Sequence, residues 1–395
     1  MLGYNQARQL GAFVARRLMA THAERPLTVA VAVNGQAVDM AITSKDFLSV
    51  FPSGAYTTVR TTGGGTRLFE WTAHVERTAK SAGKILAGQL RESTVQSQNV
   101  VQTLSTPHSL RKVLDKTVCS AMQHFHCQFP DALDSELRIT ALVSLDPDTQ
   151  QPCIAAHVAP LPPLPQPPVR VEVRGHPRKD ASSKTSSWVT ERAPLEKIMQ
   201  QADVGAGGVN EFLLSVKEDK GGVTKQAIYE GGQTNFYAIV DGCVHTAPDG
   251  TVLEGTVRRL TFEVCEQIGI KVVKEAPDLL QAAEKWEGAL ISSTSRLLLP
   301  IDELYVPADG SPSSHDDLLC RFDNSSADSL SVALASAVAA AVEEHSEPIP
   351  GLKNCHTCDC PGKIDCTPQA GDDEEAADIE NTATEDASQQ ESVAM

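Results

Sequence analysis

Two lysines lie among small hydroxyl residues in GHPRKDASSKTSSW, residues 175–188. A lysine held in an apolar pocket loses its proton more readily and can then form a Schiff base with a carbonyl group. Trp188 and Val189 would help to bury Lys184, whereas Lys179 follows His-Pro-Arg and is expected to be solvated. The segment therefore predicts Lys184 as the nucleophile, with a plain surface loop as the alternative.

A single acid, Glu230, precedes two glycines in YEGGQTNFYAIVDG, residues 229–242. The residues after the glycines alternate at the period of a strand, with Phe236 and Ala238 on one face and Tyr237 on the other. A hairpin turn would explain the glycines but would not need the acid. Taken alone, the segment fits an exposed acid in a hairpin connection.

Two further segments offer groups that suit an anion. LEGTVRR, residues 253–259, places a glycine and free backbone N–H groups at the start of a helix, where phosphate binds readily. ALISSTSRLLLP, residues 289–300, ends an apolar strand in hydroxyl residues and Arg296. Neither segment is specific by itself, because helix starts and polar strand ends are common.

The elements that must position these groups fall into two blocks. The first block, residues 26–160, mixes the two periodicities and predicts a small α+β domain. Its expected strands are residues 29–33, 54–60 and 137–145, and its expected amphipathic helices lie around residues 75–85 and 110–125.

Six prolines follow in PLPPLPQPP, residues 160–168. So much proline removes backbone donors and favours an extended spacer, which predicts an interdomain linker at residues 161–168. A larger second domain is expected at residues 169–346. Its expected strands are residues 169–173, 212–216, 235–240, 271–273 and 289–292, and its expected helices are residues 256–268 and 330–342.

The chain is acidic, but unevenly. Its net charge is −17, and nine acids without any base lie in residues 371–395, so the rest carries about −8. This balance argues against nucleic acid or an anionic membrane as a partner, since both attract positive charge. No apolar run is long enough to span a bilayer.

The cysteines and the two ends of the chain bear on location. Six of the ten cysteines are scattered through patterned segments, which suits reduced thiols and predicts an intracellular protein, in the cytoplasm or an organelle. Residues 1–25 contain three arginines and no acid before Glu24, so they fit either an amphipathic helix or a transit peptide for a plastid or mitochondrion.

Residues 347–395 form a low-complexity tail that is predicted to be disordered. The tail contains Cys355, Cys358, Cys360 and Cys366. Their spacing lacks the pair-loop-pair form of common zinc sites. A flexible, redox-sensitive tail is therefore favoured, and no metal site is predicted.

Taken in order, AYTTVR, HVERTAKSA, the Lys-Thr-Ser segment, EGGQTNF, LEGTVRRLTFEVCEQIGI and ISSTSRLLLPID resemble the fold-type IV pyridoxal-phosphate enzymes. These include branched-chain and D-amino acid aminotransferases and aminodeoxychorismate lyases. The resemblance spans roughly residues 50–302. The chain looks especially similar to plant branched-chain-aminotransferase-like proteins, which share the GAYTT-x-RT motif. It implies a small N-terminal α/β domain and a larger, β-barrel-like C-terminal domain with helices.

The resemblance implies pyridoxal 5'-phosphate as cofactor and gives each part of it a residue. Lys184 would hold the cofactor as an aldimine and then shuttle the substrate proton. Glu230 would face the pyridine nitrogen and keep it protonated. The phosphate would be bound by Arg77 from HVER, the backbone of Thr256 and Val257, and the hydroxyl of Thr294.

On the substrate side the resemblance implies Tyr56 and Arg60, and the backbone amides of Ser295 and Arg296. The implied activity is transfer of an amino group between a small amino acid and a 2-keto acid. Two alternatives stay open: β-elimination of the aminodeoxychorismate-lyase type, and a degenerate cofactor-binding protein without turnover. The resemblance also implies a homodimer, with active sites near the subunit interface.

The chain departs from the family pattern near several of these residues. The usual Gly-Ile-Thr-Arg at the phosphate-binding helix is Gly-Thr-Val-Arg at residues 255–258, which keeps the backbone donors and loses one hydroxyl. Relatives often have an asparagine three residues after the lysine, where this chain has Ser187. In branched-chain enzymes a tyrosine bonds the phenolic oxygen of the cofactor, and Val189 takes its place here. Pro194 is expected to interrupt the following helix. These departures bear on the substrate more than on the cofactor.

Overall fold

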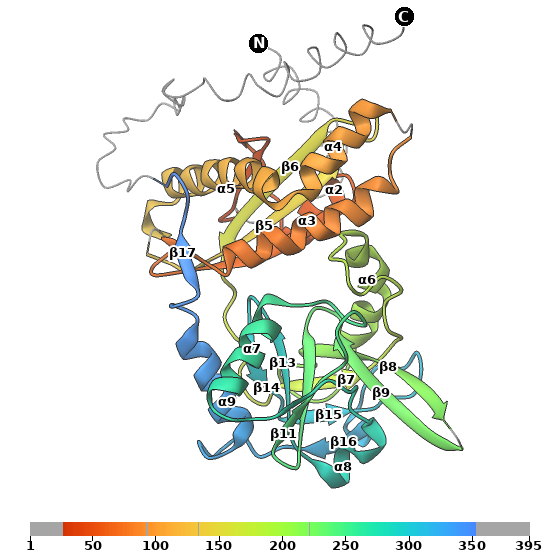
Figure 1. Ribbon diagram of the computed structural model, residues 1–395. Coiled ribbons are helices and arrows are strands. Elements are labelled where there is room, and N and C mark those ends of the chain that lie inside the picture. The colour runs from red at the N-terminus through yellow and green to blue at the C-terminus, as the bar shows by residue number, and fades with distance from the viewer. Residues whose placement is uncertain (1–26, 92–93, 133, 221, 353–395) are drawn as a thin grey trace, which may run out of the picture. The chain divides into compact units, whose positions relative to one another are not determined.

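The computed structural model describes residues 27–91, 94–132, 134–220 and 222–352 (Figure 1). The expected N-terminal helix or transit segment and the four tail cysteines lie outside these residues. Within them, no helix has the length and apolar character needed to cross a membrane. The same residues also contain no cluster of three His, Cys, Asp or Glu side chains suited to a metal ion.

The first sheet has seven strands in the order β17-β4-β3-β5-β6-β1-β2, and its neighbouring strands are antiparallel. Its strands are β1 (Ala30–Val33), β2 (Gln36–Val38), β3 (Gly54–Thr62), β4 (Arg67–Phe69), β5 (Leu137–Leu145), β6 (Pro152–Pro160) and β17 (Ser346–Pro348). The helices of this part are α2 (Ser44–Val50), α3 (Trp71–Ala87), α4 (Val95–Ser105), α5 (Pro107–Gln128) and the 3-10 turn η1 (Pro130–Ala132). The three strands and two helices expected here are confirmed.

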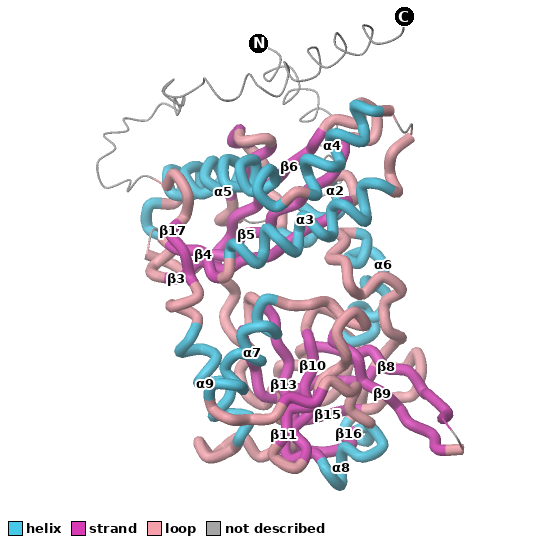
Figure 2. Tube along the Cα trace, in the orientation of Figure 1, coloured by secondary structure: helices cyan, strands magenta, loops and turns pink. Residues whose placement is uncertain are grey.

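Alternation of side chains along the strands gives this sheet two different faces. Ala55 and Val59 of β3 belong to a core that α3, α4 and α5 complete, and Figure 2 shows these helices along one side of β5 and β6. Tyr56 points to the opposite face, where it packs with Phe47 of α2 and with Val189. This second face is the one available for a site.

The chain changes sheet at the proline-rich segment, because residues 161–168 connect β6 to β7, the first strand of the second sheet. The proposed division into a small and a large domain rests on this change. The last strand, β17, returns to the first sheet and pairs with β4. Residues 347 and 348, which the sequence analysis assigned to the disordered tail, therefore belong to a strand.

The second sheet has ten strands, in the order β12-β11-β10-β9-β8-β7-β15-β16, with β13 paired to β10 and to β14. Its strands are β7 (Arg170–Val173), β8 (Glu211–Lys220), β9 (Val223–Gly231), β10 (Asn235–Val240), β11 (Cys243–His245), β12 (Val272–Val273), β13 (Trp286–Ser293), β14 (Leu297–Pro300), β15 (Glu303–Tyr305) and β16 (Leu318–Arg321). Its helices are α6 (Ser187–Met199), α7 (Thr256–Gln267), α8 (Ala282–Lys285) and α9 (Leu330–Ala341), with 3-10 turns η2 (Leu279–Gln281) and η3 (His315–Asp317).

Strand β10 shows why the sheet lies between two apolar cores. Phe236 and Ala238 belong to one core, together with Ile291 of β13. Tyr237 and Ile239 belong to another core, which α7 and α9 close. The alternation in the sequence thus predicts this strand and both of its faces correctly.

Helix α6 corrects one expectation, because it continues through Pro194 instead of ending there. A proline inside a helix removes one N–H donor and crowds the carbonyl four residues earlier. That carbonyl belongs to Thr190, which is exposed, so it can turn toward water. The helix after Lys184 is therefore present, and it brings further side chains toward the second face of the first sheet.

Candidate active site

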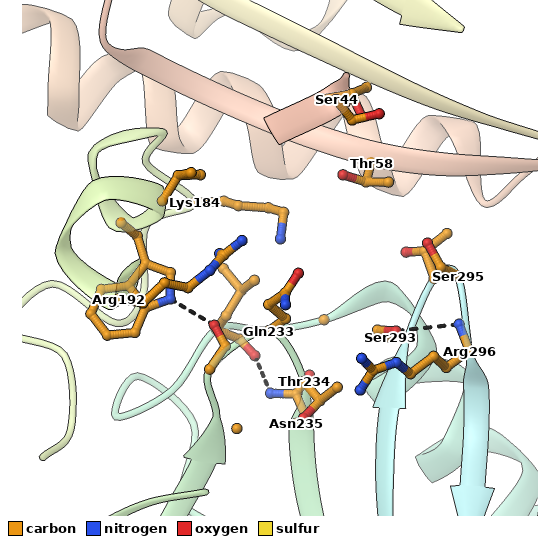
Figure 3. Close-up of a pocket in the computed structure, with 18 of the residues that line it drawn as sticks. Ser44, Thr58, Lys184, Arg192, Gln233, Thr234, Asn235, Ser293, Ser295 and Arg296 are labelled. Carbon is orange, nitrogen blue, oxygen red and sulfur yellow. Dashed lines mark hydrogen bonds between the residues drawn. The ribbon is translucent and has the colours of Figure 1, made fainter. Parts of the chain in front are cut away.

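A cavity of about 620 Å³ is lined by residues from both sheets. Figure 3 shows Lys184 and Arg192 on one side of it, with Ser295 and Arg296 on the opposite side and Thr58 of the first sheet above. The expected site residues that line the cavity are Tyr56, Arg77, Lys184, Glu230, Thr256, Val257, Thr294, Ser295 and Arg296. The fold thus brings together all but one of the residues that the sequence analysis selected.

Arg60 is the exception and a correction. It does not line the cavity, and its guanidinium donates to Glu136 at 2.7 Å. Arg138 lies directly opposite Arg60 in the β3–β5 ladder and does line the cavity. Directly paired residues share a face of the sheet, so the difference between the two arginines lies in the pairing of Arg60 with Glu136, which is distant in the sequence.

The backbone of Lys184 is fixed against the first sheet. Its carbonyl accepts the N–H of Tyr56 at 2.9 Å, and its own N–H donates to Ser81 Oγ at 3.2 Å. An isolated bridge between Ala55 and Thr185 continues this contact. The segment before α6 therefore behaves as a short additional edge to β3, and it directs the lysine side chain into the cavity.

The amine of Lys184 lies 4.6 Å from the centre of the Tyr56 ring. Burial lowers the pKa of Lys184, and although the phenol of Tyr56 opposes this, the guanidinium groups of Arg77 and Arg178 lower the pKa further. A lysine with a lowered pKa has a larger share of neutral, nucleophilic amine near pH 7. Lys179 is exposed and does not line the cavity, so only Lys184 of the two has this environment.

Tyr56 has an unusual acidity for a buried phenol. Burial raises the pKa of Tyr56, but the positive charges of Lys184 and Arg192 outweigh that effect and lower the pKa to about 8. A phenol of this kind holds its proton less tightly than a free tyrosine does. Tyr56 can therefore hold or release a proton beside the Lys184 amine.

Glu230 is only 3% exposed, so the interpretation as an exposed hairpin acid is wrong. One carboxylate oxygen accepts from Arg178 Nε at 2.8 Å, and the other accepts from the backbone N–H of Leu253 at 3.1 Å. Each oxygen keeps a further acceptor position. Glu230 also lines the cavity, where it can accept a hydrogen bond from a protonated ring nitrogen.

The glycines beside Glu230 are required by close packing. Neither Gly231 nor Gly232 has a positive φ, so turn geometry does not demand them. A Cβ on Gly231 would lie 2.1 Å from Thr234 Oγ1, and a Cβ on Gly232 would lie 2.3 Å from the ring of Phe212. The glycines therefore let the chain that carries Glu230 pass against its neighbours.

Gly232→Ala is expected to lower the free energy of unfolding by about 1–3 kcal/mol, because the new methyl group must displace the buried ring of Phe212. Urea unfolding followed by circular dichroism measures the change. The control is Gly88→Ala, since the nearest atom to a Cβ there is 3.6 Å away. Equal stabilities for the two variants would contradict this account of the glycine pair.

Four of the expected residues, Arg77, Thr256, Val257 and Thr294, line the cavity, and we call them the phosphate cup. Helix α7 begins at Thr256, and Gly255 at its N-cap has no side chain to occupy the first N–H groups. Arg77 Nε is buried and has no hydrogen-bond partner among the described residues. Burial lowers the pKa of Arg77 to about 10, which leaves it positively charged near pH 7. An uncapped helix start beside a partly unsatisfied guanidinium suits a phosphate group.

The turn between β13 and β14 adds Thr294 and Ser295 to the cavity. The N–H of Arg296 donates to Ser293 Oγ at 3.3 Å, as Figure 3 shows. The guanidinium of Arg296 is engaged by Glu211 at 3.2 Å and by the carbonyl of Asn210 at 3.1 Å. The expected contribution of Arg296 through its backbone, and not its side chain, stays a prediction.

Sequence reasoning missed five charged residues of the cavity, which are Lys45, Arg138, Arg178, Arg192 and Glu196. Arg192 lines the cavity from α6, and its Nε donates to Glu196 at 2.7 Å. Lys45 of α2 donates to the other oxygen of Glu196 at 2.8 Å. The four-residue spacing of Arg192 and Glu196 is the available signal, but the expected helix break at Pro194 concealed it.

Comparison with known proteins adds independent findings. Residues 54–304 match the family described as amino-transferase class IV. The chain is similar in structure to a hypothetical aminotransferase from Mycobacterium tuberculosis in its PLP-bound form, with a TM-score of 0.53, 18% identity, and coverage of 80% of this chain and 99% of that chain. It is also similar to the branched-chain aminotransferase from Thermoproteus uzoniensis, with a TM-score of 0.54, 17% identity, and coverage of 81% and 99%.

The Escherichia coli branched-chain amino acid aminotransferase gives a TM-score of 0.52 at 14% identity, with 81% of this chain and 99% of that chain covered. At such identities the structural similarity establishes the fold alone. The comparison with curated proteins gave no match. The match of residues 54–304 covers well over half of the chain.

Proposed function

The chain belongs to the class IV aminotransferases, and from that premise we propose that it transfers an amino group between a small amino acid and a 2-keto acid with pyridoxal 5'-phosphate as cofactor. One observation carries the proposal: Lys184, Glu230 and the phosphate cup line a single cavity. These are the groups that bind the aldehyde, the ring nitrogen and the phosphate of this cofactor.

The residues present suit the cofactor at both ends. The buried, unpartnered Nε of Arg77 and the uncapped start of α7 suit its phosphate, and Glu230 suits a protonated ring nitrogen. Bound pyridoxal phosphate supplies an electron sink for the bonds at the substrate α-carbon. Lys184 binds it covalently, and Glu230 holds a proton at the ring nitrogen.

Lys184 has a second task in this proposal. Once the substrate amine has displaced it from the cofactor, the free amine at Nζ would take the proton from the substrate α-carbon and would deliver it to the C4′ carbon of the cofactor. The lowered pKa of Lys184 suits a base that works near pH 7. Tyr56, whose ring lies 4.6 Å from this nitrogen, is placed to influence its charge.

A carboxylate of the substrate would bind at the side of the cavity that the first sheet lines. Arg138 lines this side, and its Nε is buried without a hydrogen-bond partner among the described residues. Ser44 accepts from Arg138 at 3.0 Å, and Thr58 and Thr140 add hydroxyl groups nearby. A cation flanked by hydroxyl donors suits a carboxylate. Tyr56 and the amides of Ser295 and Arg296 complete the proposed substrate contacts.

A screen of amino donors tests the proposal. Purified protein is supplied with each amino acid and with 2-oxoglutarate or pyruvate as acceptor, and pyruvate release from aminodeoxychorismate is measured in parallel. We expect transfer to at least one keto acid and no pyruvate release. Pyruvate release without transfer would identify a lyase, and a bound cofactor without either product would identify a protein without turnover.

We also propose that the protein is a homodimer. The family resemblance implies this, because it implies active sites near a subunit interface. Light scattering at micromolar concentration is expected to give about twice the chain mass of 42.3 kDa. A mass equal to one chain under these conditions would contradict the dimer.

The proposed location is inside the cell, in the cytoplasm or an organelle. In the described part of the chain, Cys119, Cys153, Cys243, Cys265 and Cys320 are free thiols, and such thiols persist in reducing compartments. Cell fractionation with an antibody tests this, and recovery of the protein from the secreted fraction would contradict it.

A further inference from the structure

His74 is a fully buried side chain on α3 that none of the roles above uses. It lies one helical turn before Arg77, a member of the phosphate cup. Its Nδ1 is 2.6 Å from Thr57 Oγ1, and its Nε2 is 3.3 Å from Thr256 Oγ1. One imidazole ring therefore connects β3 with the first residue of α7.

The contacts of Arg77 determine which ring nitrogen carries the hydrogen. Its Nη2 donates to Thr57 Oγ1 at 2.9 Å and lies 3.2 Å from His74 Nδ1. A guanidinium can only donate, so Nδ1 acts as the acceptor. In a neutral imidazole the hydrogen then lies on Nε2, which donates to the hydroxyl oxygen of Thr256.

The ring is held neutral by its surroundings. Burial lowers the pKa of His74 well below its usual value, and the positive charges of Arg77, Lys184 and Arg259 lower it further. A protonated ring would also turn an N–H toward the Arg77 guanidinium, which has no acceptor to offer. The contacts of the ring and the surrounding positive charges thus favour the neutral tautomer with its hydrogen on Nε2.

This arrangement decides what Thr256 can do. Its oxygen accepts from His74, so its own hydroxyl hydrogen is left to donate to a third group. Thr256 lines the cavity at the start of α7. The expectation that this helix start loses a hydroxyl is therefore wrong: Thr256 carries the hydroxyl and position 257 is valine, so the hydroxyl is displaced by one residue.

We propose that His74 is a positioning residue for the phosphate cup: it orients the Thr256 hydroxyl as a donor to the cofactor phosphate and, through Thr57, holds the Arg77 guanidinium beside it. This inference rests on the proposed function. The inference predicts that His74 strengthens binding of the cofactor's phosphate group and does not affect formation of the covalent bond to Lys184.

Two substitutions at His74 separate the two ring nitrogens. His74→Gln places an amide N–H near the position of Nε2, whereas His74→Asn places its amide near Nδ1 and leaves Thr256 without a donor. Thr256→Val removes the hydroxyl with little change of shape. Cofactor-free protein is titrated with pyridoxal 5'-phosphate and, separately, with pyridoxal, and the visible band of the bound form gives each dissociation constant.

We expect His74→Asn and Thr256→Val each to weaken binding of pyridoxal 5'-phosphate by about 10-fold, the effect of one charge-assisted hydrogen bond. Pyridoxal binding should change little, and the His74→Asn/Thr256→Val double variant should lose no more than either single variant. His74→Gln keeps a donor for Thr256 but loses the Nδ1 acceptor for Thr57, so it should also weaken binding of the phosphate form, and its loss should add to that of Thr256→Val. Circular dichroism confirms that each variant is folded.

Equal weakening for pyridoxal and its phosphate would show a merely structural role and overturn the inference. Variants that keep the wild-type preference for the phosphate would overturn it too, without touching the proposed function. If the wild-type protein itself shows no preference for the phosphorylated cofactor, the proposed function fails and the inference fails with it.

Discussion

Replacement of Lys184 by alanine is expected to lower kcat by about 10³-fold or more and to remove the visible absorption band of the bound cofactor. The alanine can neither bind the cofactor covalently nor take the proton from the substrate. In the unsubstituted protein, the Lys184 amine lies 4.6 Å from the centre of the Tyr56 ring, and Lys184 lines the cavity. Absorption spectra of the purified variant and its initial rates measure the two effects.

Lys179→Ala is the matched control for this experiment. It removes a lysine five residues away that is exposed and lies outside the cavity lining. Its spectrum and turnover should equal those of the wild type. A Lys184→Ala variant that keeps the band, or a Lys179→Ala variant that loses it, would contradict the assignment of the nucleophile.

Glu230→Gln is expected to lower kcat by at least about 100-fold while the cofactor stays bound. A neutral amide cannot hold the proton on the ring nitrogen as a carboxylate does. The amide also turns one N–H toward a donor, because both oxygens of Glu230 accept, from Arg178 and from the N–H of Leu253. Some loss of stability is therefore expected beside the loss of rate.

Glu172→Gln separates these two effects. Glu172 is a fully buried carboxylate whose oxygens accept from Arg174 Nε and from Ser313 Oγ, both at 2.5 Å, and it does not line the cavity. The two variants should lose comparable stability in urea unfolding, whereas only Glu230→Gln should lose turnover per bound cofactor. Full turnover in Glu230→Gln would exclude the role at the ring nitrogen.

Regular elements with a clear period were predictable from the sequence. The alternation around Phe236 gave β10 with both of its faces, and the helix after Gly255 gave α7 with the correct start. Both segments depend on local rules: side chains alternate in a strand, and a glycine often precedes or follows a helix. Thr256 and Val257, which the family resemblance assigned to the phosphate, line the cavity at the start of this helix.

The failures have a non-local cause. Arg60 was predicted from the family resemblance, but its guanidinium pairs with Glu136, 76 positions away in the sequence, and Arg138 lines the cavity instead. Arg192 was missed because a proline was expected to end α6, and the cost of that proline is small where Thr190 faces solvent. Ion pairs between distant residues and solvent exposure are properties of the packed chain.

Glu230 shows the same limit in another form. Its flanking glycines suggest a turn, and the turn hypothesis predicts an exposed acid. The structure instead buries the acid, because the glycines admit Phe212 and Thr234 against the chain and Arg178 supplies the opposite charge. None of these partners is close to Glu230 in the sequence except Thr234, so their contribution could not be read from spacing.

The most direct test of the account is to locate the lysine that binds the cofactor. The protein is loaded with pyridoxal 5'-phosphate and reduced with borohydride, which fixes the cofactor permanently on its lysine, and the labelled peptide is identified by mass spectrometry. The account predicts a single label on Lys184, in the peptide that continues into Thr185 and Ser186. A label on Lys179, or no labelled lysine at all, would contradict it.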